Sequence, residues 1–127
     1  MSVVKVSAAI ILQDKKVLIA KRPEGKHKAG YWEFPGGKIE SDETAQQALY
    51  REIKEELDIE IINPEIYHQV EFQYPEKKVS LEFFKITNFN GEPKGLEGQI
   101  IRWVILSELN LYQFPEANLA VVEQLIK

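Results

Sequence analysis

The 127-residue sequence contains no cysteine, which excludes disulfide bonds and thiolate metal sites. It also has no long hydrophobic run: the apolar stretch 3–12 is interrupted by Lys5 and Ser7, is too short to span a bilayer, and lacks a secretory cleavage pattern. Basic residues are not in excess, since 16 Lys and Arg stand against 20 Asp and Glu. The net charge of −4 provides no overall positive field to attract a nucleic-acid polymer. We therefore expect a cytoplasmic protein that binds neither nucleic-acid polymers nor membranes.

The apolar content is sufficient for a hydrophobic core. Hydrophobic residues make up 44% of the chain and aromatic residues 10%, and the length falls in the range of about 100–150 residues that is most common for one domain. No internal repeat or low-complexity linker divides the sequence. We expect one domain over residues 1–127, acting as a monomer.

The hydrophobic pattern predicts a mixed α/β protein. Strands are expected at 3–12, 16–20, 31–34, 65–74, 79–86 and 99–106. Helices are expected at 45–57, where Thr44 and Gln47 form a capping-box pattern, and at 117–126. Pro35, Gly36 and Gly37 predict a sharp turn after the third strand. The expected fold class is α/β, an α/β/α sandwich with a mixed, curved sheet flanked by helices.

The first expected helix carries an acidic face. At about 100° per residue, Glu52, Glu55 and Glu56 fall together beside the apolar stripe, and such like charges repel by about 0.2–0.5 kcal/mol per pair. A cation would relieve this repulsion, and oxygen ligands without nearby His or Cys favour Mg²⁺, with Mn²⁺ as a substitute, over zinc. Arg51 is spaced to pair with Glu55. The alternative is an acidic helix face that is simply solvated.

The spacing of polar residues from 37 to 59 resembles a known motif. Gly37 is followed by Glu43, then by Arg51-Glu52 and by Glu55-Glu56, and this pattern is similar to the sequence box of the Nudix hydrolases. One position departs from the family, which usually has Gly where this chain has Asp58. We expect a helix C-terminus with positive φ there, which Asp tolerates.

The resemblance extends over nearly the whole chain to the MutT-type branch of that family, which hydrolyses nucleoside triphosphates and removes oxidised dGTP. The matching segments are 32–40, 91–93, 97–99 with Trp103, and 114–118. The resemblance implies a Nudix-like sandwich and Mg²⁺-dependent attack on the β-phosphorus of 8-oxo-dGTP, giving 8-oxo-dGMP and pyrophosphate. The implied partner is therefore a small nucleoside triphosphate.

Site residues follow from the same resemblance. The implied metal ligands are Gly37 through its carbonyl, Glu52, Glu55, Glu56 and Glu97. The implied catalytic residues are Arg51, Glu52, Glu56 and Glu97, with Glu52 the first choice of general base and Glu97 the second. The implied substrate-binding residues are Arg22, His27, Glu33, Phe34, Pro35, Gly36, Lys38, Lys77 and Asn118.

Several alternatives stay open on the sequence alone. Arg22 and His27 are also compatible with ordinary surface positions, Phe34 with the core, and Asn118 with an N-terminal cap of the last helix. If Asn118 faces a base, its amide can donate and accept, which suits the neighbouring O6 acceptor and N7–H donor of an 8-oxo-purine. The enzyme could instead act on CTP or another pyrimidine nucleotide. A module that binds nucleotides without catalysis is the alternative of another class.

Charge is also segregated along the chain. Residues 40–60 hold eight acidic and two basic side chains, whereas residues 1–39 hold eight basic and three acidic ones. This division suits a metal on one wall of a site and a small polyanion against the other.

Overall fold

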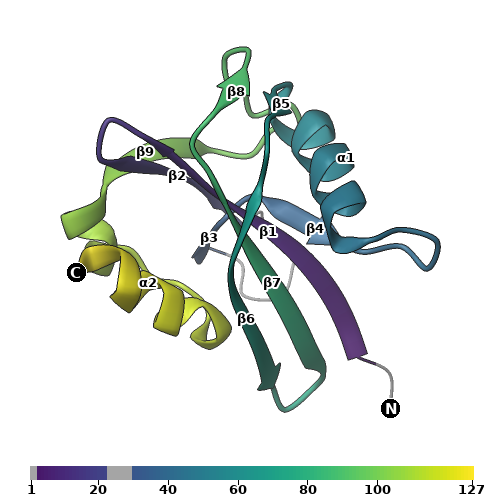
Figure 1. Ribbon diagram of the computed structural model, residues 1–127. Coiled ribbons are helices and arrows are strands. Elements are labelled where there is room, and N and C mark those ends of the chain that lie inside the picture. The colour runs from purple at the N-terminus through teal and green to yellow at the C-terminus, as the bar shows by residue number, and fades with distance from the viewer. Residues whose placement is uncertain (1–2, 23–29) are drawn as a thin grey trace.

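The computed structural model describes residues 3–22 and 30–127, and its centre is a mixed sheet of seven strands (Figure 1). The strands are β1 Val3–Gln13, β2 Lys16–Lys21, β3 Trp32–Glu33, β4 Gly36–Lys38, β6 Glu65–Gln73, β7 Lys78–Ile86 and β9 Ile101–Ile105. The main order is β3-β2-β1-β7-β6, with β4 paired to β1 and β9 paired to β2. The β1–β7 pair is parallel and the others are antiparallel, so the sheet is mixed, as predicted.

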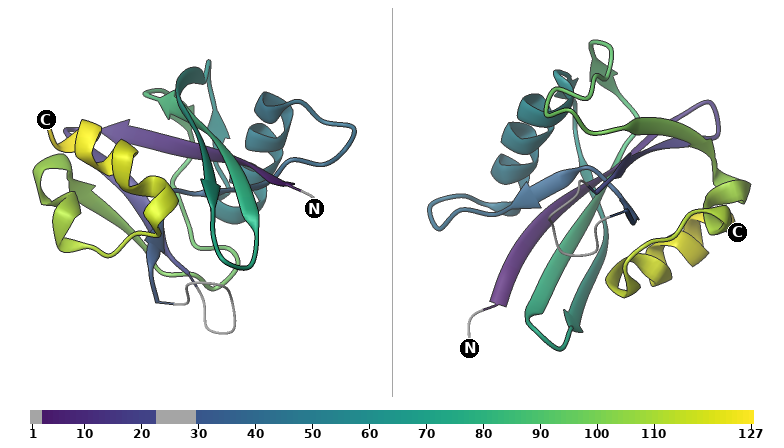
Figure 2. Two further views of the ribbon diagram at one scale, coloured as in Figure 1. Left: turned by 90° about the horizontal axis from the view of Figure 1, so that it is seen from below. Right: turned by 180° about the vertical axis from the view of Figure 1, so that it is seen from behind.

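Two α-helices cover opposite faces of this sheet (Figures 1 and 2). They are α1 Ala45–Leu57 and α2 Leu119–Ile126. Two 3₁₀ helices, η1 Leu106–Leu111 and η2 Glu116–Asn118, lead into α2. Within the described residues, no helix is long and apolar enough to cross a membrane. The predicted α/β sandwich is confirmed.

The side chains on the two faces of β1 pack into two separate hydrophobic cores. Ala8 and Ile10 pack in the core beneath α2, whereas the alternate residues Ala9 and Ile11 pack in the core beneath α1. All four side chains are at most 4% exposed. This alternation is the period of two that a strand imposes on its side chains, and it makes β1 the shared wall of both cores.

Both ends of α1 follow the sequence. The Thr44 hydroxyl accepts a hydrogen bond from the Gln47 amide at 3.1 Å, and the Gln47 side chain accepts one from the Thr44 amide at 2.8 Å. Asp58 ends the helix in the left-handed region, with φ 59° and ψ 38°. The capping box and the positive φ at Asp58 are thus confirmed.

Some expected boundaries are wrong. Gly36 and Gly37 do not form a sharp turn but belong to β4, which pairs with β1. A Cβ on Gly36 would lie 2.0 Å from the Ser7 carbonyl oxygen, so glycine is needed for this close approach. The last helix begins at Leu119 rather than 117, because residues 116–118 take the tighter 3₁₀ form.

Besides β4, four short elements in the described part of the chain were not predicted. They are η1, η2, and the strands β5 Glu60–Ile61 and β8 Phe89–Asn90, which pair with each other outside the main sheet. A two-residue strand has no measurable period, so the pattern gives no signal for it.

Candidate active site

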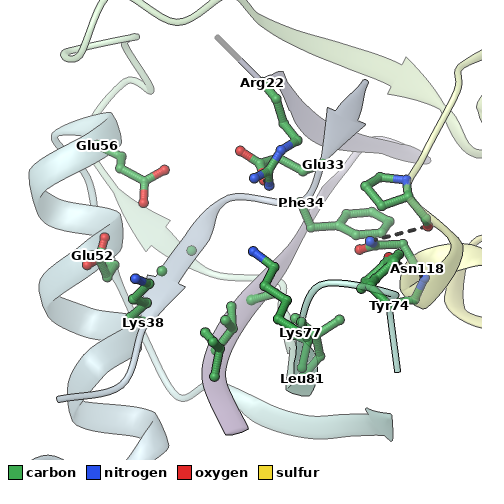
Figure 3. Close-up of a pocket in the computed structure, with 18 of the residues that line it drawn as sticks. Arg22, Glu33, Phe34, Lys38, Glu52, Glu56, Tyr74, Lys77, Leu81 and Asn118 are labelled. Atoms are coloured by element: carbon green, nitrogen blue, oxygen red, sulfur yellow. Dashed lines mark hydrogen bonds and ion pairs between the residues drawn. The ribbon is translucent and has the colours of Figure 1, made fainter. Parts of the chain in front are cut away.

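A cavity of about 370 Å³ opens between α1 and η2, over the first half of β1 (Figure 3). Charged side chains line one end of it and apolar side chains line the other. We call these the carboxylate end and the apolar end. The carboxylate end comprises Arg22, Glu33, Gly37, Lys38, Glu52, Glu56 and Glu97, and the apolar end comprises Val4, Val6, Ala8, Phe34, Tyr74, Val79, Leu81, Pro115, Ala117 and Asn118.

Two carboxylates from successive turns of α1 dominate the carboxylate end. Glu52 and Glu56 both point toward the cavity (Figure 3), and Glu56 is only 9% exposed. Burial, a hydrogen bond to Glu52 and repulsion from Glu52, Glu97 and Glu33 raise the pKa of Glu56 to about 9. At neutral pH a proton therefore neutralises Glu56 unless a cation takes its place.

Arg51 holds Glu52 in position from the outer side of α1. Its guanidinium donates to both oxygens of Glu43, at 2.7 and 2.8 Å, and to Glu52 Oε1 at 2.9 Å. These bonds lower the pKa of Glu43 to about 2 and raise the pKa of Arg51. The predicted pair with Glu55 exists but is longer, at 3.4 Å. Arg51 therefore orients Glu52 more directly than it orients Glu55.

Glu55 lies apart from the other predicted ligands. Its side chain is 53% exposed, and it is not among the residues that line the cavity. The structure therefore brings Glu52 and Glu56 together with Glu97 at the cavity, while Glu55 stays on the outer rim beside Arg51. Its role as a metal ligand remains a prediction.

The backbone of β4 packs directly against Glu52. A Cβ on Gly37 would lie 2.3 Å from the carboxylate carbon of Glu52, so any other residue there would displace this carboxylate. In the part of the chain that the structure describes, no three acidic or histidine side chains are already arranged as a complete metal site. The adjacent carboxylates of Glu52 and Glu56, with burial that raises the pKa of Glu56 and with oxygen-only chemistry, nevertheless fit a hard divalent cation such as Mg²⁺.

The loop that carries Glu97 is docked on the C-terminal end of α1. The Gln99 side chain accepts a hydrogen bond from the Glu97 amide at 2.9 Å and donates one to the Glu56 carbonyl at 3.2 Å. The Leu96 amide also donates to that carbonyl, at 3.0 Å. Gln99 was part of the matching segment, but the sequence alone gave no partner for its side chain.

Arg22 and Glu33 form an ion pair above the cavity (Figure 3), with Nη1 and Oε1 2.5 Å apart. Burial raises the pKa of Glu33, although the charge of Arg22 and its hydrogen bond act in the opposite direction. Arg22 is therefore paired rather than an ordinary surface cation. His27, which was predicted to bind substrate, lies outside the described residues.

Two further lysines face the cavity. Lys38 lies on β4, close to Glu52, and the Lys77 side chain extends from the β6–β7 turn toward the middle of the cavity (Figure 3). Gly36 also lines the cavity, whereas Pro35 does not. The Pro35 carbonyl instead accepts a hydrogen bond from the Ala9 amide at 2.7 Å.

Phe34 and Asn118 meet at the apolar end. Phe34 is 4% exposed and stacks on Phe114 with ring centroids 5.2 Å apart, so it belongs both to the core and to the cavity wall. Asn118 directly precedes α2, but its side chain makes no capping hydrogen bond. The capping role left open by the sequence is therefore absent.

The Asn118 amide has unused hydrogen-bonding capacity. It is 8% exposed, and its Nδ2 donates to the Pro115 carbonyl at 3.5 Å. Among the described residues, no group donates to its side-chain oxygen. Buried polar groups are nearly always hydrogen-bonded, so this amide faces the cavity as an available donor and acceptor.

Sequence reasoning missed most of the apolar wall. Val4, Val6, Val79 and Leu81 come from β1 and β7, and Tyr74 follows β6. Strand alternation puts these side chains on the α2 face of the sheet, but it does not separate a core position from a cavity wall.

Comparisons with known proteins agree with this geometry. The model of the NUDIX domain family matches residues 7–124. The 8-oxo-dGTP diphosphatase of Haemophilus influenzae is 39% identical over 125 residues, which cover 98% of this chain and 92% of that protein. The CTP pyrophosphohydrolase of Escherichia coli is 36% identical over 123 residues, which cover 97% and 91%.

A solved MutT structure, from work on the Aliivibrio salmonicida and Vibrio cholerae proteins, has a TM-score of 0.85 and 38% identity, with 98% of both chains covered. The family match spans nearly the whole chain, and three residues of the motif, Gly37, Glu52 and Glu56, line the carboxylate end of the cavity. The chain therefore belongs to the Nudix family of hydrolases.

Proposed function

We propose that this protein is a Mg²⁺-dependent diphosphatase that converts 8-oxo-dGTP to 8-oxo-dGMP and pyrophosphate. The observation that carries the proposal is that one cavity holds both a cluster of carboxylates around the buried Glu56 and, at its apolar end, the Asn118 amide with unused hydrogen-bonding capacity. The carboxylate cluster suits a metal–triphosphate, and the Asn118 amide suits a base. The names of the relatives support the same choice of substrate.

The carboxylate end would hold the metal. Glu52 and Glu56, with the Gly37 carbonyl and Glu97, would be its ligands, and Glu55 would join them from the rim. The metal, when bound, would neutralise the phosphate oxygens and favour ionisation of the attacking water.

The chain's own groups would divide the remaining work. Arg51 holds the Glu52 carboxylate in a fixed orientation through the 2.9 Å bond, which suits Glu52 as the general base that takes the proton from water. Glu97 is the second candidate for that role. The amino groups of Lys38 and Lys77, together with Arg22, would bind the negative charge of the triphosphate.

At the apolar end, Phe34 and its aliphatic neighbours would exclude water from the base. Asn118 would then donate to O6 and accept from the N7–H of an 8-oxo-purine, whereas guanine has an acceptor at N7. A site built to hydrogen-bond one pattern rejects the other because buried polar groups are left unpaired.

The test is a nucleotide panel with pyrophosphate release as the readout. The purified protein with Mg²⁺ is given 8-oxo-dGTP, dGTP, CTP and dCTP at matched concentrations. We expect kcat/KM for 8-oxo-dGTP to exceed that for dGTP by at least about a hundredfold, as for other sites that hydrogen-bond a discriminating group. Equal values for these two nucleotides would rule out the proposed substrate.

CTP is the second candidate substrate, because a CTP pyrophosphohydrolase is almost as similar to this chain as the diphosphatase is. A preference for CTP in the same panel would select it. Binding of nucleotides without release of pyrophosphate would instead indicate a non-catalytic module. We further propose that the chain acts as one domain and as a monomer in the cytoplasm, and light scattering of the purified protein tests the monomer.

A further inference from the structure

Tyr74 connects two segments of the apolar end that are distant in sequence. It follows β6, is 4% exposed, and its hydroxyl accepts a hydrogen bond from the Ala117 amide at 3.0 Å. The bond is buried and spans 43 residues of sequence. It therefore fixes η2 to the β6–β7 turn at the base-facing wall of the cavity, beside Asn118 (Figure 3).

The side-chain amide of Asn118 is held only weakly by hydrogen bonds of its own. The Nδ2 bond to the Pro115 carbonyl is long, at 3.5 Å, and the short bond of this residue is made by its backbone amide to the same carbonyl, at 2.9 Å. The direction of the side-chain amide therefore depends on where the η2 backbone lies. Ala117, the residue directly before Asn118, is the point at which Tyr74 holds that backbone.

The Tyr74 ring is held independently of its hydroxyl. It packs against Phe72 with ring centroids 4.7 Å apart, and the Tyr74 amide donates to the Lys77 carbonyl at 2.8 Å across the turn. Removal of the oxygen atom alone would leave the ring and the turn in place. It would also leave the Ala117 amide buried without its acceptor, and such a group moves to find another partner or destabilises the segment.

We propose that Tyr74 is a positioning residue whose hydroxyl sets the orientation of Asn118 and, through it, the base selectivity of the enzyme. The inference rests on the proposed function, which assigns the base to this end of the cavity. Tyr74 in this view acts on the substrate through Asn118 rather than by a hydrogen bond of its own.

The test is a double-mutant cycle with Tyr74→Phe, Asn118→Ala and the double variant. Selectivity is the kcat/KM for the nucleotide that the wild type prefers divided by the kcat/KM for a second nucleotide. For 8-oxo-dGTP the second nucleotide is dGTP, and for any other preferred nucleotide it is one with a different base. We expect Tyr74→Phe to lower this ratio about tenfold, mainly through a higher KM, with kcat within about twofold of wild type. The two effects should be strongly non-additive, because Tyr74→Phe has little left to disturb once Asn118 is Ala.

Tyr112→Phe is the matched control. The Tyr112 hydroxyl also accepts one hydrogen bond, from Arg102 at 3.4 Å, but Tyr112 does not line this cavity. We expect it to leave the selectivity ratio unchanged. Hydrogen exchange gives a readout without substrate: Tyr74→Phe should speed exchange of the Ala117 amide about tenfold or more relative to wild type, and Tyr112→Phe should not.

Other outcomes would overturn the inference. Additive effects of Tyr74→Phe and Asn118→Ala would show that Tyr74 does not act through Asn118. Unchanged selectivity in Tyr74→Phe, with only a lower Tm, would show that the hydroxyl is merely structural. A wild type that prefers a nucleotide other than 8-oxo-dGTP would refute the proposed substrate alone, since the cycle is then measured on that nucleotide.

Discussion

The two ends of the cavity are built in opposite ways. The carboxylate end comes largely from one continuous stretch, in which β4 and α1 supply Gly37, Lys38, Glu52 and Glu56. The apolar end comes from β1, β7, the β6–β7 turn and η2, which lie far apart in sequence. The residues of the carboxylate end thus lie mainly in one stretch and those of the apolar end in several, so mutations can disturb the two ends separately.

The strongest way to break the carboxylate end is Glu56→Gln. This change keeps the shape of the side chain but removes the charge that a cation needs, so we expect kcat to fall about 10²–10³-fold. The preference among bases in the residual activity should persist. The Tm of the metal-free variant should not fall, because the raised pKa of Glu56 means that the wild-type group is already neutral there at pH 7.

Glu60→Gln is the matched control for that change. Glu60 is an exposed acidic residue just after α1, and its nearest cation is Lys54 at 3.8 Å. It should leave kcat unchanged. Full activity of Glu56→Gln would contradict the assignment of the carboxylate end to metal and catalysis.

At the apolar end the corresponding change is Asn118→Ala. We expect the preference for the favoured base to fall about tenfold, the usual effect of losing one good hydrogen-bonding group, while kcat changes little. Steady-state kinetics on 8-oxo-dGTP and dGTP measure this ratio. An unchanged ratio with a lower Tm would instead point to a helix cap, which the side-chain geometry of Asn118 speaks against.

The smallest expected effect, a small change in Tm, is that of Glu43→Gln, which removes the carboxylate that pairs with Arg51. The folded-state pKa of Glu43 is about 2, below its usual 4.5, so its bond to Arg51 stabilises the fold above pH 4.5 and is lost as the pH falls toward 2. We expect the variant to have a Tm about 1–3 °C below wild type at pH 7. This difference should close on acidification to about pH 2, and a constant gap would refute the assignment.

The sequence predicted the local structure around the carboxylate end because the signals for it are short-range. The capping box of Thr44, the period of α1 and the tolerance of Asp58 for positive φ all depend on residues within one or two helical turns. The facing carboxylates Glu52 and Glu56 follow from the same helical period. The predicted pair of Arg51 with Glu55 exists, although the shorter bonds of Arg51 are to Glu43 and Glu52.

The strand at Gly36 and Gly37 and the support of Asn118 could not be predicted, because they depend on contacts that no local sequence pattern encodes. Gly36 and Gly37 have the composition of a turn, but their lack of side chains serves close packing against Ser7 and Glu52 within a strand. The bond between Tyr74 and Ala117 joins segments 43 residues apart, and its existence depends on the register of the whole sheet. The sequence could identify Asn118 as a candidate but not the hydroxyl that holds its backbone.

The placement of α1 and α2 on opposite faces of the sheet bears on how such enzymes diversify. If the proposed function holds, substitutions around η2 and the β6–β7 turn would alter which base is accepted without changing residues 37–56, which include most of the proposed metal ligands. A lineage can therefore explore new substrates while it keeps a working reaction centre. This chain is similar both to an 8-oxo-dGTP diphosphatase and to a CTP pyrophosphohydrolase, two relatives whose names differ in the base of the substrate.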